Sequence, residues 1–401
     1  MLSVTKTMGV SVLQLHRGPV YPPSNGEEVR IWKTAEKFSE IGDVWLAHPS
    51  GSDHEMQSDV HAINVDNVFL KHKLTRIYLW NALLGYSEDN LIDRLQSWST
   101  VRAVRRLDRD TTVDIVCCES PQMLRASRYL ARRYDAALLL NKHNAMFDLL
   151  EQQLRSRPIP APIRRRAVSN LYSFEQQGIA DADGVVFQSE SDRRQFTCSA
   201  DTVTEVIPNG ADYEAISQGG DHERLRRQLG IHDGATICLF IGACDYEPNR
   251  AAAKLIDHRL APSLPDTEFL IVGRNPPNVS RENVYTPGFV EDLPGALELA
   301  DIALCPLAMG SGTKLKMMDY LAAGLPIVTT SVGAEGIALE DRKTALIRDT
   351  IPEIKNAIVE LQQSAPLAAT LSENAKSLGK RHSWAELLSS YEHVAQQLLQ
   401  R

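Results

Sequence analysis

The order of short apolar runs, glycine-containing loops and helical patterns is the feature that most constrains the fold of this chain. An apolar run over 10–15 leads into a loop rich in glycine, proline and asparagine, and then into helical spacing over 27–41. The same order restarts at 236–241 and continues at 268–272, and both of these runs end in a glycine. The alternation predicts α/β domains with doubly wound parallel sheets, which bind ligands beyond the carboxyl ends of their strands.

The chain is long enough for two domains, because 401 residues exceed what one hydrophobic core usually serves. A β run stops at Pro208, and the Asn209-Gly210 pair that follows favours a turn. We therefore expect two Rossmann-like domains, over 1–208 and 209–401, whose ligand loops face a cleft between them. The last predicted helix, 383–400, is the segment of the second half that could pack back on the first domain.

The composition is that of an ordinary globular protein. Hydrophobic residues make up 43% of the chain and charged residues 23%. No apolar run approaches the roughly 18–20 residues that span a bilayer, and the first residues do not resemble a signal peptide, so we expect a cytoplasmic protein. The six cysteines show no metal-ligand spacing and several lie in apolar runs. We therefore expect buried thiols, with neither a disulfide framework nor a metal site.

Charge is distributed unevenly along the chain. The net charge is −8, yet Lys and Arg exceed Asp and Glu by seven between 66 and 170. Helical patterns at 73–84 and 91–106 combine Trp and Leu with basic residues, and the polar stretch 51–67 is predicted to be a loop. The pattern fits peripheral contact with a membrane surface or a lipid phosphate better than contact with nucleic acid. For the two helices themselves we favour packing against the domain over membrane contact, and the basic residues could also be simply solvated.

A glycine-rich stretch at 309–326 is the strongest candidate for a ligand site. Gly310 and Gly312 permit a tight turn, and the residues from 313 to 323 favour a helix. A helix start attracts anions, because its first amides are unpaired and the helix dipole is positive there. Lys316 and Asp319, three residues apart, share one helical face. This pair offers a cation for a diphosphate and a carboxylate for a ribose; the alternative is a capped amphipathic helix with solvated lysines.

Taken in order, the motifs resemble the family 4 (group 1) glycosyltransferases of the GT-B architecture over nearly the whole chain. In the first half the matching motifs are Tyr21-Pro-Pro-Ser-Asn-Gly26 with Arg30, His143-Asn144 and Val206-Ile-Pro-Asn-Gly-Ala-Asp212. In the second half they are Phe240-Ile-Gly242, Tyr246-Glu-Pro-Asn249, Ile271-Val-Gly-Arg-Asn275, Gly288-Phe-Val-Glu-Asp292, Gly310-Ser-Gly-Thr-Lys-Leu-Lys316 and Ala322-Ala-Gly-Leu-Pro326.

The resemblance implies a metal-independent transferase that needs no cofactor beyond its co-substrate. In such enzymes the second domain binds a nucleoside diphosphate sugar, and the first binds an acceptor such as a saccharide, a glycolipid or a lipid-linked saccharide. The glycosyl group moves to an acceptor hydroxyl with retention of its anomeric configuration. No candidate nucleophile stands out in the sequence, which agrees with attack by the acceptor on the face that the diphosphate leaves.

The resemblance also assigns residues. His143 and Lys316 are the expected catalytic residues, with His143 in contact with the transferred sugar or its leaving oxygen. Gly26 lets the first loop approach the donor phosphates. The remaining expected donor-binding residues are Gly242, Gly273 and Arg274, then Gly288, Phe289 and Val290 near the base, Ser311, Gly312 and Thr313 at the diphosphate, and Asp319 at the ribose.

Two departures from the family pattern leave other functions open. Ser311 and Asp319 stand where many relatives carry two glutamates. Cys244-Asp-Tyr-Glu247 stands where relatives often carry a basic pair, and Arg250 or Arg274 could take the role of that pair. The main alternative is therefore a non-catalytic GT-B module that binds sugar nucleotides or a partner transferase. A sugar-nucleotide epimerase is a third possibility. NAD chemistry is disfavoured, because no predicted strand leads into a full Gly-x-Gly-x-x-Gly turn.

Overall fold

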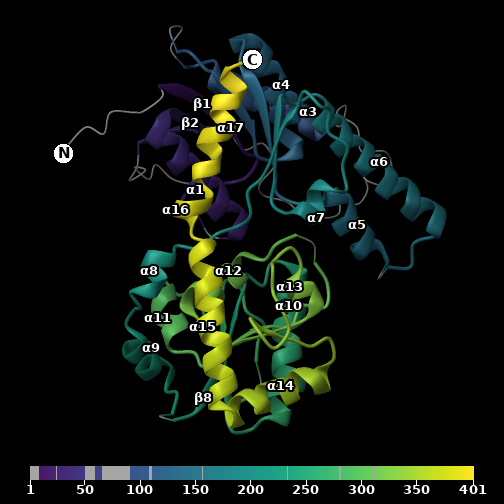
Figure 1. Ribbon diagram of the computed structural model, residues 1–401. Coiled ribbons are helices and arrows are strands. Elements are labelled where there is room, and N and C mark those ends of the chain that lie inside the picture. The colour runs from purple at the N-terminus through teal and green to yellow at the C-terminus, as the bar shows by residue number, and fades with distance from the viewer. Residues whose placement is uncertain are drawn as a thin grey trace. The chain divides into compact units, whose positions relative to one another are not determined.

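The computed structural model describes residues 9–23, 25–49, 59–65, 91–107, 111–155, 157–232, 234–279, 281–310 and 312–401. The chain forms two compact α/β units (Figure 1), one made of Met1–Ile207 with Leu388–Arg401 and the other of Pro208–Leu387. The helix predicted at 73–84 lies outside the described residues. Within the described residues, no helix has both the length and the apolar character that crossing a membrane requires.

The first unit is built on a parallel sheet. Its strand order over the described residues is β3-β2-β1-β4-β5-β6-β7. The first strand, VSVLQL, is buried at every position, as expected for a central strand covered by helices on both faces. The order reverses between β1 and β4, so the loops after these two strands flank the position where doubly wound sheets bind ligands. The strands are β1 (Val10–Leu15), β2 (Gly42–His48), β3 (Val60–Asn64), β4 (Ile115–Cys118), β5 (Ala137–Lys142), β6 (Gly184–Phe187) and β7 (Val203–Val206).

The helices of the first unit cover both faces of this sheet. The first helix begins at Gly26, where the side chain of Asn25 accepts a hydrogen bond from the Glu28 amide and so caps it. The helices are α1 (Gly26–Ile41), α3 (Leu91–Val104), η1 (Pro121–Met123), α4 (Leu124–Tyr134), α5 (Met146–Arg155), α6 (Ala161–Ala180), α7 (Glu190–Arg193) and α17 (Ser389–Leu399).

The second unit repeats the arrangement with strand order β10-β9-β8-β11-β12-β13 over the described residues. Here the order reverses between β8 and β11. The strands are β8 (Thr236–Ile241), β9 (Thr267–Val272), β10 (Val284–Gly288), β11 (Ile302–Cys305), β12 (Ile327–Thr329) and β13 (Leu346–Ile347). The helices are α8 (Tyr213–Ser217), α9 (His222–Leu229), α10 (Glu247–Leu255), η2 (Ile256–Leu260), η3 (Ala261–Ser263), α11 (Leu293–Glu298), α12 (Leu315–Ala323), α13 (Ser331–Ala334), α14 (Ile351–Gln363), α15 (Ala365–Arg381) and α16 (Trp384–Leu387).

The two doubly wound sheets confirm the predicted fold class, and five of the six cysteines are buried, as predicted. Several local predictions were wrong. The predicted loop at 51–67 contains β3, whose VHAIN sequence buries only two of five positions and so lacks a clear strand pattern. The helix predicted from Thr313 begins at Leu315. The helix predicted at 383–400 is two helices, because the chain passes from the second unit to the first at Leu388.

The last helix, α17, completes the first unit by packing against α1 and β7 (Figure 1). Tyr391 on α17 is fully buried, and its ring meets that of Phe38 edge-on with a centroid distance of 5.4 Å. Its hydroxyl donates to Asn141 Oδ1 at 3.0 Å and accepts from an Arg30 Nη2 atom at 3.4 Å. The same Arg30 atom donates to the Ile207 carbonyl at 2.6 Å. One tyrosine thus links α17 to polar groups of β5 and α1.

We expect Tyr391→Phe to destabilise the first unit by about 1–3 kcal/mol, because the buried Asn141 oxygen loses its donor while the packing stays. Hydrogen–deuterium exchange on the full chain measures this as faster exchange in α1 and β5, with exchange in the second unit unchanged. Gln396→Ala, at an exposed position of the same helix, is the control. Unchanged protection of α1 and β5 in Tyr391→Phe would show that the hydroxyl contributes nothing.

Candidate functional site

In the second unit, the glycine-rich loop joins β11 to α12 beside the point where the strand order reverses. Gly310 and Gly312 have φ of +138° and +70°, which L side chains rarely adopt, so the loop conformation requires glycine. The predicted residue Ser311 between them lies outside the described residues. The predicted residue Thr313 is buried, and its Oγ1 accepts a hydrogen bond from Asn209 Nδ2 at 2.8 Å.

Lys314 holds the loop in this conformation. Its Nζ donates to the Gly312 carbonyl at 2.6 Å and contacts Glu335 Oε2 at 3.1 Å. The residue occupies the N-cap position of α12 but makes no side-chain cap. The structure therefore adds a second amine to the helix start that was predicted to receive an anion.

The predicted residue Lys316 lies in the first turn of α12. Its Nζ donates to Asn249 Oδ1 at 2.6 Å and lies 4.2 Å from the ring centroid of Phe240. Burial lowers the pKa of Lys316 to about 8, a shift that the nearby Cys305 and Cys244 thiols partly oppose and the charge of Lys314 reinforces. A partly desolvated amine of this kind gains strongly from an anionic ligand.

The predicted residue Asp319 follows one turn later and is partly exposed. Burial and the charge of Asp212 raise the pKa of its carboxyl group to about 7, against the opposing effect of Lys316. Near neutral pH this carboxyl therefore exchanges its proton readily, and an arriving hydrogen-bond donor favours the charged form.

Glycines lie at the ends of the neighbouring strands. Gly242 follows β8, Gly273 follows β9 and Gly288 ends β10. The Gly273 amide donates to the Gly288 carbonyl at 2.9 Å. A Cβ on Gly273 would lie 2.1 Å from the Gly242 carbonyl oxygen, and one on Gly242 would lie 2.7 Å from the side chain of Asn249. Side chains are therefore excluded at two of these strand ends.

The other predicted donor-binding residues lie on the same edge. Arg274 is partly exposed and, within the described part of the chain, its Nε is buried without a hydrogen-bond partner. Phe289 is 61% exposed, and Val290 packs against the core of the unit. The strand order β10-β9-β8-β11 thus gathers Gly288, Gly273, Gly242 and the glycine-rich loop at four consecutive strand ends.

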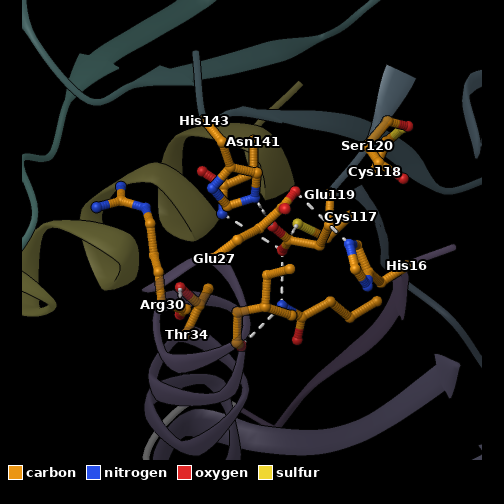
Figure 2. A network of polar contacts seen from close by, with 12 residues as sticks. His16, Glu27, Arg30, Thr34, Cys117, Cys118, Glu119, Ser120, Asn141 and His143 are labelled. Carbon is orange, nitrogen blue, oxygen red and sulfur yellow. Dashed lines mark hydrogen bonds and ion pairs between the residues drawn. The ribbon is translucent and has the colours of Figure 1, made fainter. Parts of the chain in front are cut away.

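In the first unit, the predicted residue His143 belongs to a buried polar network (Figure 2) centred on Glu119. The Glu119 carboxylate accepts hydrogen bonds from Gln14 Nε2 at 2.6 Å, Asn141 Nδ2 at 3.3 Å and the Cys117 thiol at 3.1 Å. His143 Nε2 lies 2.8 Å from its other oxygen. Burial acts to raise the pKa of Glu119, but the hydrogen bond and charge of His143 outweigh it, and the pKa is lowered.

Both ring nitrogens of His143 have protein partners. Nε2 lies beside Glu119, and Nδ1 lies 3.1 Å from Gln188 Nε2. The side chain is only 8% exposed. The ring is thus held in one orientation, and Nδ1 is the atom that an incoming hydroxyl could reach by displacing Gln188.

Gly26, the other predicted residue of the first unit, is the first residue of α1. It is followed by Glu27, whose carboxylate lies 3.6 Å from His16 Nε2. The nearby His16 imidazole lowers the pKa of Glu27 to about 2. An anion arriving at this helix start would therefore meet a carboxylate.

Sequence reasoning missed Glu119 and Gln188 in the first unit and Lys314 and Asn249 as contacts in the second. One available signal was position, because Glu119 directly follows the buried strand β4 at the edge where ligands bind. Lys314 could have been found by its place in the same glycine loop. The hydrogen bond between Asn249 and Lys316 joins residues 67 positions apart, and spacing alone does not predict it.

Comparison with known proteins finds a family match in the second unit. Residues 235–364 match the family described as glycosyl transferases group 1. The D-inositol 3-phosphate glycosyltransferase of Corynebacterium aurimucosum is 27% identical over 55% of this chain and 58% of its own length. The chain thus aligns with little more than half of that relative. The enzyme of the same name from Mycobacteroides abscessus is 22% identical over 97% of this chain and 90% of its own.

Solved structures with the same fold cover nearly the whole chain. Sucrose-phosphate synthase from Thermosynechococcus elongatus superposes with a TM-score of 0.76 at 14% identity, over 97% of this chain and 99% of its own. Anabaena HepE in complex with UDP-glucose superposes with a TM-score of 0.69 at 16% identity, over 96% of this chain and 99% of its own. At this level of identity the likeness concerns the fold. The chain thus has the GT-B fold of these structures, and its segment 235–364 is similar to the group 1 glycosyltransferases.

Proposed function

We propose that this protein is a retaining glycosyltransferase that moves a glycosyl group from a nucleoside diphosphate sugar to an acceptor hydroxyl. The observation that carries the proposal is the pair of amines, Lys314 and Lys316, at a glycine-rich helix start inside the segment that matches the family. The relatives named for D-inositol 3-phosphate glycosyltransfer and the HepE complex with UDP-glucose support a sugar-nucleotide donor.

In this proposal the second unit binds the donor. Lys316 and the amides at the start of α12 receive the diphosphate, and Asp319 accepts hydrogen bonds from the ribose. Phe289 and the backbone at Gly273 and Gly288 lie near the base. The exposed ring of Phe289 offers a flat apolar surface to such a base.

The proposed chemistry needs stabilisation of the departing diphosphate more than it needs a nucleophile. Breaking the anomeric bond leaves negative charge on the diphosphate while the sugar becomes oxocarbenium-like, so fixed donors aimed at the departing oxygens lower the barrier. We assign this role to Lys316 and the loop amides in place of a divalent ion. The acceptor hydroxyl attacks from the same face, which retains the anomeric configuration, and the leaving phosphate takes its proton.

The first unit binds the acceptor, which we propose to be a saccharide, a glycolipid or a lipid-linked saccharide, in the cytoplasm. His143, fixed by Glu119, contributes Nδ1 to a hydroxyl of the transferred sugar once Gln188 gives way. Gly26 remains a proposed contact to the donor phosphates, although the neighbouring carboxylate of Glu27 opposes an anion there.

Lys316→Ala tests the central assignment. Incubation of the full chain with a panel of nucleotide sugars should release free nucleoside diphosphate slowly, and we expect the variant to reduce this rate by about 100-fold or more, as for loss of one donor to a developing charge. Lys343→Ala removes an exposed lysine of the same unit and is the matched control. Donor binding without turnover, even with saccharide and lipid-linked acceptors present, would favour the non-catalytic module. An altered sugar still attached to its nucleotide would indicate an epimerase.

Donor affinity should depend on pH in both directions. When the pH rises above the Lys316 pKa of about 8, Lys316 loses the charge that attracts the diphosphate. When the pH falls below the Asp319 pKa of about 7, Asp319 gains a proton and accepts hydrogen bonds less well. Calorimetric titration with the nucleoside diphosphate should therefore give the tightest binding between about pH 7 and 8. Asp319→Asn should remove the acid limb and Lys316→Arg should move the alkaline limb upward; limbs unchanged by both variants would contradict the assignment.

His143→Ala should lower the rate of glycosyl transfer by about 100-fold or more if its ring contacts the sugar. Gln188→Ala should lower it by less than about 5-fold, because a ligand that displaces Gln188 does not need it. Steady-state rates and thermal unfolding of both variants are to be compared. Equal losses of rate that follow equal losses of stability would mean that both side chains only support the fold.

A further inference from the structure

We propose that one face of the first unit docks on an anionic lipid surface. The face consists of Leu95, Trp98 and Arg102 on α3, Arg105 directly after this helix, and Tyr129 and Arg132 on α4, and we call it the α3–α4 face. The two helices pack against each other. This inference rests on the proposed function in one respect, because the acceptors proposed above include lipid-linked saccharides.

The apolar part of the face is unusually exposed. Trp98 is 62% exposed, Tyr129 43% and Leu95 39%. Leu95 and Trp98 are three residues apart and so lie on one side of α3. Single exposed apolar residues need no explanation, but three large ones on two packed helices mark an interaction surface. Trp and Tyr in particular favour the interface between lipid headgroups and acyl chains.

The charged part of the face is arginine, and two of its guanidinium groups lie beside these rings. The Arg102 guanidinium carbon is 5.4 Å from the Trp98 ring centroid, and Arg105 Nη2 donates to the Tyr129 hydroxyl at 2.8 Å. Both contacts hold the guanidinium groups beside the aromatic rings. A guanidinium held in this way can present its remaining N–H groups to a phosphate in bidentate fashion.

In the part of the chain that the structure describes, carboxylates do not neutralise these arginines. Among the described residues, none forms an ion pair with Arg102, Arg105 or Arg132. On the same helix Arg128 shows the usual alternative, since it pairs with Asp181. The face is thus positive on a chain whose net charge is −8. Such local charge is complementary to phosphate headgroups, and the Trp and Leu beside it favour a lipid surface over a nucleic acid, whose phosphates offer no apolar layer.

The test uses the full chain and vesicles of phosphatidylcholine with or without 30% phosphatidylglycerol. We expect sedimentation with the anionic vesicles only, weakened by added salt. The double variant Arg102→Ala/Arg105→Ala should lower the partition coefficient for the anionic vesicles by about 5-fold for each arginine removed. The control Arg224→Ala/Arg227→Ala removes the same charge from exposed positions of the second unit and should change it by less than about 2-fold.

Trp98 gives an independent readout. Vesicles that contain brominated acyl chains should quench part of the tryptophan fluorescence of the wild type, and Trp98→Phe should lose that part. Equal binding to neutral vesicles, equal weakening by the control variant, or binding to RNA or DNA without binding to vesicles would overturn the proposal.

Nucleoside diphosphate release in the absence of lipid separates this proposal from the proposed function. Arg102→Ala/Arg105→Ala should leave that rate unchanged, because neither side chain belongs to the residues assigned to transfer. If the wild type releases diphosphate but does not bind vesicles, the docking proposal alone fails. If it binds vesicles but releases no diphosphate from any donor, the transferase assignment alone fails.

Discussion

The donor site proposed for the second unit depends on the absence of two side chains. Gly273 can lie against the Gly242 carbonyl only because it has no Cβ, which would be 2.1 Å from that oxygen. Gly242 in turn leaves room for Asn249, and the Asn249 side chain holds the amine of Lys316. Backbone packing at two strand ends therefore sets the position of a charged group on a helix that begins more than forty residues later.

The first unit solves a different problem, which is how to keep a carboxylate charged inside an apolar sheet. Glu119 is almost fully buried, and isolated burial of such a group is costly. Side chains from β1, β4 and β5 and the His143 ring supply donors to it. The network compensates the lost hydration, and it also fixes the orientation of the His143 ring. The two units thus position their functional groups differently. The second unit relies on glycines that allow close backbone packing, and the first unit relies on many hydrogen bonds.

Much of the fold could be predicted from the sequence, because the buried strands of parallel sheets are continuous apolar runs such as 10–15 and 236–241. The edge strand β3 could not, since it buries only two of its five positions and shows no clear alternation. For the site, glycine spacing and the family resemblance identified the strand ends of the second unit. The partners of Lys316 and His143 were missed because they come from residues distant in sequence, and no periodicity encodes which side chains meet there.

The return of α17 to the first unit has a consequence for biosynthesis. The ribosome completes Met1–Ile207 early, but the helix that packs on α1 and β7 is translated only after the 180 residues of Pro208–Leu387. At about 5–20 residues per second, this delay is roughly 10–40 s. During that time the nascent first unit lacks Tyr391 and leaves Phe38 and Asn141 without the ring and the hydroxyl that they contact in the finished protein. Emergence of α17, rather than emergence of residue 207, is therefore the event that allows the first unit to mature.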